Sequence, residues 1–102
     1  MVERVAFVTG GMGGIGTAIC KRLAVNGNKV VANCLPGYDR KEEWLANMRT
    51  QGYSVHAAEG NVDEFDSCAD MFYRIGSIIG PVDILVNNAG ITRDGVFKRM
   101  SE

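Results

Sequence analysis

The sequence has no excess of either charge and little of the chemistry that builds nucleic-acid or metal sites. Its 11 lysines and arginines nearly balance 12 aspartates and glutamates, which gives a formal net charge of -1. A nucleic-acid-binding surface carries a clear basic excess, so we expect no nucleic-acid partner. The single histidine, His56, stands alone on its predicted strand with no acidic or cysteine partner for a site and is interpreted as an ordinary packed residue.

Cysteine is also scarce. Cys20, Cys34 and Cys68 are odd in number and show no C-x-x-C spacing, a pattern that supports neither a disulfide framework nor a zinc site. We therefore expect free thiols and no metal. No apolar run approaches the length of a membrane span, and the first residues lack the basic start of a signal peptide. Together these absences predict a cytoplasmic protein with no membrane partner.

What the sequence does contain is an alternation of short apolar runs and amphipathic stretches. Buried strands are predicted for residues 4–9, 29–34, 54–59 and 82–88. Helices are predicted between them, with apolar positions at helical spacing: Ile15, Ile19 and Leu23; Trp44, Leu45 and Met48; Phe65, Cys68, Phe72, Ile75 and Ile79. Asp63 is the expected N-cap of the third helix. Short connections in this order predict a parallel sheet covered on both faces.

Five glycines fall within the eight residues of "TGGMGGIG", Thr9 to Gly16, directly after the first predicted strand. Unpaired backbone N–H groups and the helix dipole make such a turn a phosphate site. We expect Gly10 to supply the tight turn, Gly14 to let a pyrophosphate approach, and Gly16 to let the helix pack on the strand. A triphosphate-binding P-loop would need a lysine where Thr17 stands.

This T-G-x-x-x-G-x-G pattern, with "NNAG" at residues 87–90, resembles the short-chain dehydrogenase/reductase family. The resemblance implies a Rossmann-type, doubly wound parallel sheet of strand order 3-2-1-4 with a nicotinamide dinucleotide beside the first strand. In the family's third-strand motif Asn61 replaces an aspartate next to the adenine. The cofactor residues that it implies are Gly10, Gly11, Met12, Gly13, Gly14, Ile15, Gly16, Gly60, Asn61, Val62, Asn88, Ala89 and Gly90.

The cofactor is predicted to be NADP(H). An NAD site places a carboxylate at the end of the second strand, where this chain has Cys34. Arg40 is our candidate for pairing with a 2′-phosphate, with Lys41 as the second choice. The alternative is that "DRKEE" is only a solvated helix start.

Within the family, "VTGGMGGIGTAICKRLA" and "NNAGITRDGVFKRM" resemble enzymes that reduce acetoacetyl-CoA to 3-hydroxybutyryl-CoA for polyhydroxybutyrate synthesis. That likeness implies an acyl-CoA substrate oriented by Asp94, with Lys98 and Arg99 near the CoA phosphates or simply exposed, and a homotetramer. One alternative is reduction of a 3-oxoacyl-acyl-carrier protein. Another, of a different class, is a dinucleotide sensor without turnover.

The family's catalytic Y-x-x-x-K pair is not found in this sequence. Its three tyrosines, Tyr38, Tyr53 and Tyr73, are followed four residues later by Glu42, Ala57 and Ser77. No catalytic residue is therefore assigned in this chain. We expect residues 1–102 to be the NADP-binding Rossmann portion of a single-domain reductase, inactive without its catalytic C-terminal part.

Overall fold

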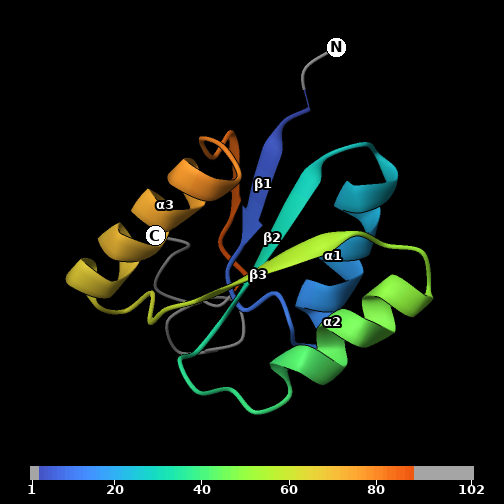
Figure 1. Cartoon of the computed structure of the whole chain (residues 1–102), viewed down its shortest axis with the longest axis horizontal. Helices are drawn as coiled ribbons and strands as arrows, with labels where there is room; N and C mark the ends of the chain where they lie inside the picture. Colours follow the sequence, from blue (N-terminus) through green and yellow to red (C-terminus); the bar gives the residue numbers. More distant parts are fainter. Residues whose placement is uncertain (1–2, 89–102) are drawn as a thin grey trace, which may run out of the picture.

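The fold is a four-stranded parallel sheet with helices on both faces (Figure 1). A computed structural model of the chain describes residues 3–88. Its elements in chain order are β1 (Val5–Val8), α1 (Gly14–Val25), β2 (Lys29–Cys34), α2 (Lys41–Thr50), β3 (Val55–Glu59), α3 (Phe65–Ile78) and β4 (Ile84–Val86). The strands lie in the order β3-β2-β1-β4, and each neighbouring pair is parallel, which confirms the predicted fold class.

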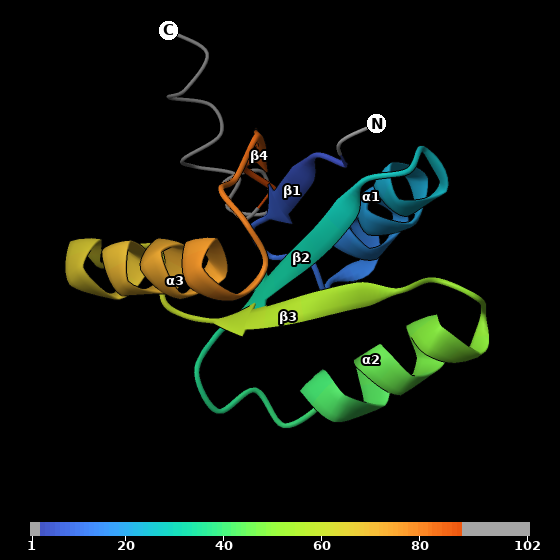
Figure 2. The same ribbon diagram turned by 45° about the horizontal axis from the view of Figure 1, so that its top comes forward.

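Two separate apolar layers hold the helices to the sheet. Helices α1 and α2 lie on one face and α3 on the other (Figure 2). The first layer includes Val8, Cys20, Val30 and Met48, and the second includes Phe7, Val31, Met71 and Ile75. These sets alternate along β1 and β2 because successive strand residues point to opposite faces. The two central strands are therefore largely apolar, as a sheet covered on both sides requires, and Lys29 and Asn33 of β2 are their polar residues.

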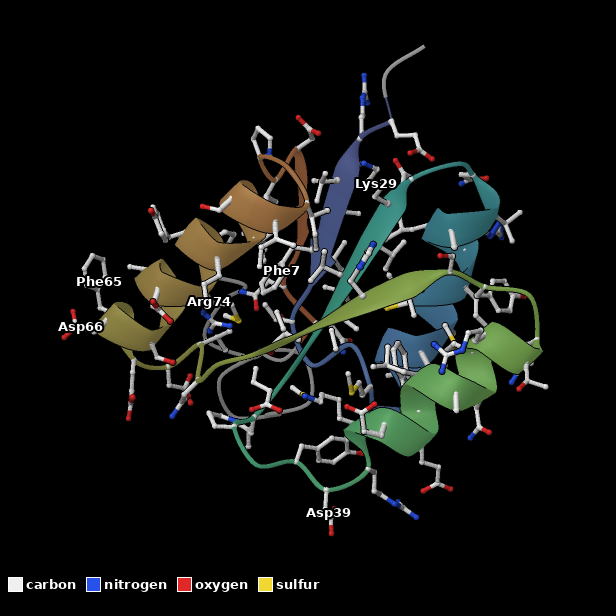
Figure 3. All side chains as sticks on the ribbon, in the orientation of Figure 1. Phe7, Lys29, Asp39, Phe65, Asp66 and Arg74 are labelled. Atoms are coloured by element: carbon white, nitrogen blue, oxygen red, sulfur yellow. The ribbon has the colours of Figure 1, made fainter. Side chains whose placement is uncertain are left out.

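Two of the three predicted helical stripes are wrong at their first residue. Ile15, the second residue of α1, is 57% exposed, and Phe65, the first residue of α3, is 84% exposed. Trp44 of α2 packs against the core as predicted. Figure 3 shows Phe65 pointing away from the sheet, whereas Phe7 lies between the sheet and α3.

The predicted N-cap of α3 is also wrong. Glu64 occupies that position, and its side chain makes no capping hydrogen bond. The Asp63 N–H donates to Asn61 Oδ1 at 3.0 Å. This hydrogen bond closes a turn over residues 61–63, which sets the direction of the chain just before the N-cap residue. None of the helices in residues 3–88 is long and apolar enough to cross a membrane.

Replacing Phe7 with alanine tests the core. Phe7 is fully buried and its ring centroid lies 5.0 Å from that of Phe72. We expect Phe7→Ala to lower the free energy of unfolding by about 3–5 kcal/mol, as for other buried aromatic residues. The matched control Phe65→Ala removes an exposed ring and should change it by no more than about 0.5 kcal/mol. Equal losses in urea denaturation would contradict the assigned core.

Candidate cofactor-binding site

The glycine loop folds tightly because two of its glycines leave no room for a side chain. Gly10 has a φ of 61°, in the left-handed region that favours glycine. A Cβ on Gly11 would lie 2.8 Å from the Ala32 Cβ of β2. A Cβ on Gly16 would overlap the carbonyl oxygen of Gly10. The predicted turn at Gly10 is thus observed, but Gly16 packs on the loop itself, and Gly11 is the glycine that lies against a strand.

Several backbone N–H groups of the loop and the first turn of α1 are left without an acceptor. The Gly11 N–H donates to the Asn33 carbonyl oxygen at 3.1 Å, and the Gly13 N–H to that of Gly10 at 3.3 Å. Within the described residues, no acceptor lies at the N–H groups of Met12, Gly14, Ile15 and Gly16. Four free donors at the positive end of a 12-residue helix are suited to a phosphate.

Two asparagines hold the Gly10 residue in place. The Gly10 N–H donates to Asn33 Oδ1 at 3.1 Å, and the Gly10 carbonyl oxygen accepts from Asn88 Nδ2 at 3.0 Å. Both asparagines are at least 96% buried. Asn88 was predicted from the sequence to lie at the cofactor, but Asn33 was not. The available signal was a lone amide inside the otherwise apolar run "KVVANC".

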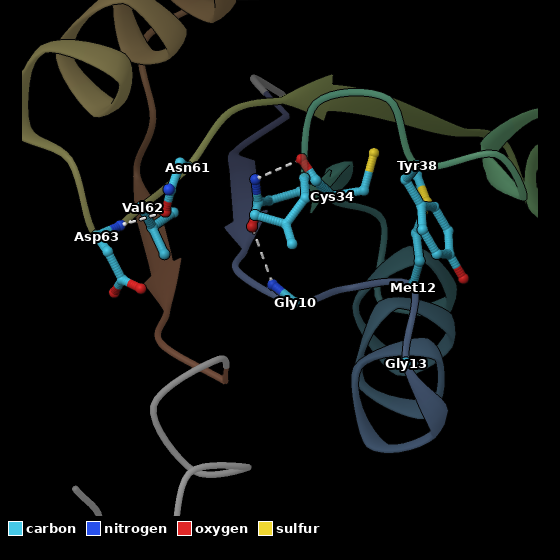
Figure 4. A pocket seen from close by; sticks show the side chains of 10 residues that line it. Gly10, Met12, Gly13, Cys34, Tyr38, Asn61, Val62 and Asp63 are labelled. Atoms are coloured by element: carbon cyan, nitrogen blue, oxygen red, sulfur yellow. Dashed lines mark hydrogen bonds between the residues drawn. The ribbon is translucent and has the colours of Figure 1, made fainter.

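A pocket of about 400 Å³ opens beside the loop (Figure 4). It lies where the C-terminal ends of β1, β2 and β3 meet, the edge at which open α/β sheets bind ligands. Its walls are formed by Gly10, Met12, Gly13, Asn33, Cys34, Leu35, Tyr38, Asn61, Val62 and Asp63. Five of these were predicted site residues: Gly10, Met12, Gly13, Asn61 and Val62. The apolar lining residues Leu35 and Tyr38 were not predicted from the sequence, because side chains in a loop follow no hydrophobic periodicity.

The other predicted residues lie around this pocket or outside the described part. A Cβ on Gly14 would meet no atom within 4 Å, so this glycine faces open space. Gly60 instead packs against Met71, whose Sδ would lie 2.7 Å from an added Cβ. Within residues 3–88, Asn88 Oδ1 is buried without a hydrogen-bond partner. Ala89, Gly90 and Asp94 lie outside the described residues, as do Lys98 and Arg99.

The two basic candidates differ in their surroundings. Arg40 is the exposed N-cap residue of α2 and does not line the pocket. The Lys41 Nζ lies 2.6 Å from Glu59 Oε2, at the end of β3. The hydrogen bond between Lys41 and Glu59 raises the pKa of the lysine and lowers the pKa of the Glu59 carboxyl. The Glu59 carboxylate near Cys34 is therefore already paired with a cation.

The thiol chemistry of the site is suppressed by burial. Cys34 ends β2 and lines the pocket. Desolvation raises the pKa of its thiol, and the nearby Glu59 carboxylate raises it further. Burial raises the pKa of Cys20 to about 12. No group of three or more histidines, cysteines and acidic residues in the described part of the chain could hold a metal ion. The free donors and the pocket suit an anionic nucleotide instead.

Alanine at two neighbouring glycines should separate packing from access. Gly16→Ala forces a Cβ onto the Gly10 carbonyl oxygen, so we expect it to lower the free energy of unfolding by about 1–3 kcal/mol. Gly14→Ala places its Cβ in open space and should be neutral or stabilise by about 1 kcal/mol. Urea denaturation of both variants checks this. A Gly16→Ala protein as stable as Gly14→Ala would contradict the loop geometry.

The Glu59 ion pair should make stability depend on pH. The folded pKa of Glu59 lies below its unfolded value, so its contribution is present above about pH 4.3 and is lost as pH falls through the folded pKa. Glu59→Gln should therefore be less stable than the parent at neutral pH and equal to it in acid. Lys41→Met should flatten the same part of the profile. A stability difference that is constant from neutral pH to acid would contradict the pair.

Comparison with known proteins agrees with this geometry. The family model for short chain dehydrogenases matches residues 4–102. The chain is 54% identical over 101 residues to the acetoacetyl-CoA reductase of Cupriavidus necator, covering 99% of this chain and 41% of that protein. It is 37% identical over 101 residues to the 3-oxoacyl-acyl-carrier-protein reductase of Staphylococcus epidermidis, covering 99% of this chain and 41% of that protein.

Solved structures show the same likeness. An actinorhodin polyketide ketoreductase variant with NADPH superimposes with a TM-score of 0.78 at 32% identity, over 86% of this chain and 33% of that one. The chain thus spans about two fifths of the curated relatives named above. Since the family model matches nearly the whole chain and the sheet has the expected strand order, this chain belongs to the short-chain dehydrogenase/reductase family.

Proposed function

We propose that this chain is the NADP-binding portion of a reductase that converts a 3-oxoacyl-CoA, in particular acetoacetyl-CoA, to the 3-hydroxyacyl-CoA. The observation that carries the proposal is the set of N–H groups at the start of α1 that have no acceptor among residues 3–88. They open beside a pocket at whose β2 end the Glu59 carboxylate is paired with Lys41. The 54% identity to an acetoacetyl-CoA reductase supports the choice of substrate.

The pyrophosphate is assigned to the glycine loop. Met12, Gly14, Ile15 and Gly16 supply N–H donors, and the helix dipole adds a partial positive charge at the same place. The bare face of Gly14 lets the phosphate oxygens approach the backbone. The local sequence builds this site without any charged side chain, which leaves the cationic residues of the β2–α2 loop for the rest of the nucleotide.

The adenosine end is assigned to the pocket. Leu35, Tyr38 and Val62 provide apolar walls for a flat base. Asn61 Oδ1 is occupied by the Asp63 N–H, which leaves its amide Nδ2 free to donate to a ring nitrogen. Glu59 would repel a 2′-phosphate as a bare carboxylate, but Lys41 neutralises it. Arg40 is exposed near this end and is proposed to pair with the 2′-phosphate.

The bound nicotinamide would supply the hydride for reducing the 3-oxo group. The residues of this chain bind and orient the cofactor. No Y-x-x-x-K pair occurs in it, so the proton donor is proposed to come from the remaining length that the relatives possess. Asp94 as a substrate residue, assembly as a homotetramer and a role in polyhydroxybutyrate synthesis stay predictions.

The second candidate function is reduction of a 3-oxoacyl group on acyl carrier protein. It is favoured by the 37% identity to such a reductase, which is lower than the 54% to the CoA enzyme over the same length. A dinucleotide sensor without turnover is the third candidate. An NADPH oxidation assay of the complete protein distinguishes all three. Turnover with acetoacetyl-CoA supports the proposal, a preference for the carrier-protein thioester supports the second candidate, and NADPH binding without turnover supports the third.

Replacing Arg40 tests the cofactor preference. Arg40→Ala in the complete protein removes a charged partner of the 2′-phosphate, an interaction worth about 1.5–3 kcal/mol, and should weaken NADPH binding roughly 10- to 100-fold. NADH lacks that phosphate and should lose little. Fluorescence titration with both cofactors measures the two dissociation constants. Equal losses for NADPH and NADH would remove Arg40 from the phosphate site.

A further inference from the structure

We propose that Asn33 is a positioning residue that fixes the two cofactor loops relative to one another. The first is the glycine loop after β1, and the second is the Gly60–Val62 segment after β3. This inference rests on the proposed cofactor site, but its geometry is independent of which nucleotide binds. Asn33 lies near the C-terminal end of β2, between the two strands that lead into these loops.

One end of the Asn33 amide holds the glycine loop. Its Oδ1 accepts from the Gly10 N–H at 3.1 Å, and the Asn33 backbone oxygen accepts from the Gly11 N–H at the same distance. Two consecutive N–H groups therefore point back at one residue. The N–H groups of Gly10 and Gly11 are therefore not available to a phosphate, and the free donors begin at Met12.

The other end of the same amide holds the second loop. Its Nδ2 lies 3.0 Å from the Gly60 carbonyl oxygen and 3.4 Å from that of Ala58. It also lies 3.2 Å from the Cys34 carbonyl oxygen and 3.5 Å from Met71 Sδ. All four are acceptors, and the group facing Oδ1 is a donor, so the amide has only one orientation that satisfies both ends.

An amide is suited to this position by its chemistry and its rigidity. A planar group with an acceptor at one end and donors at the other fixes the distance between the two loops it touches. Asn33 is only 4% exposed, so water cannot readily replace its partners. Since Gly10, Asn33, Asn61 and Val62 all line the pocket, the amide also fixes the two lining segments relative to one another.

The test compares Asn33→Ala and Asn33→Leu with the parent in the complete protein. Leucine keeps the branching at Cγ in a larger side chain and removes both hydrogen-bonding ends, whereas alanine removes them and leaves space. We expect the dissociation constant and the KM for NADPH to rise about tenfold in both variants, the effect of losing one to two hydrogen bonds. The value of kcat at saturating NADPH should stay within about twofold, because the hydrogen bonds position the cofactor and take no part in the chemistry. If Asn33 contributed to stability alone, the two variants would contain less folded enzyme, but the KM for NADPH of the folded fraction would be unchanged.

Val30→Ala is the matched control. Val30 is fully buried in the same strand but belongs to the layer facing α1 and α2, and it contacts neither loop through a polar group. It should lose stability with an unchanged NADPH dissociation constant. NADPH affinities of Asn33→Ala and Asn33→Leu that match the parent and Val30→Ala would overturn the proposal.

Hydrogen exchange of the unliganded parent separates this inference from the proposed function. Asn33 should protect the Gly10 amide although the loop lies at the surface edge of the sheet. A Gly10 amide that exchanges as fast as a free loop amide would overturn the Asn33 contact without any variant. A protected Gly10 amide in a protein that binds no NADPH would instead overturn the proposed function and leave the contact standing.

Discussion

The site depends on how the peptide groups of Gly10 are held. Its N–H is bound by Asn33 of β2 and its carbonyl oxygen by Asn88, which follows β4, so both strands that flank β1 fix the loop leaving it. The left-handed φ of Gly10 and the close contact of Gly11 with Ala32 then turn the chain into α1. The direction in which the free N–H groups point is a consequence of these contacts.

The sheet supplies these contacts because it is parallel and buried on both faces. Parallel strands bring the C-terminal ends of β1, β2 and β3 to one edge, where the pocket opens. Most apolar residues of β1 and β2 belong to the two layers of the core, and of these Cys34 also lines the pocket. Only Asn33, near the end of β2, departs from this apolar pattern with a side chain directed at both loops.

The sequence allowed the fold to be predicted well and the site in part. The strands and the glycine turn follow from patterns that extend over several residues, such as the valine runs and "TGGMGGIG", and the strand order follows from the family resemblance. The exposure of Ile15 and Phe65 depends on where each helix meets the sheet edge, which periodicity does not contain. The Lys41–Glu59 pair and the contacts of Asn33 with Gly10, Ala58 and Gly60 join residues 18 to 27 positions apart, so only the folded chain shows them.

A crystal structure of the complete protein with NADP⁺ tests the central claim most directly. The account predicts pyrophosphate oxygens at hydrogen-bonding distance, about 2.7–3.2 Å, from the N–H groups at the start of α1, with the adenine in the pocket beside Tyr38 and Val62. It also predicts that the Gly10 N–H stays bound to Asn33. A pyrophosphate bound away from the glycine loop, or a Gly10 N–H turned toward the phosphate, would contradict it.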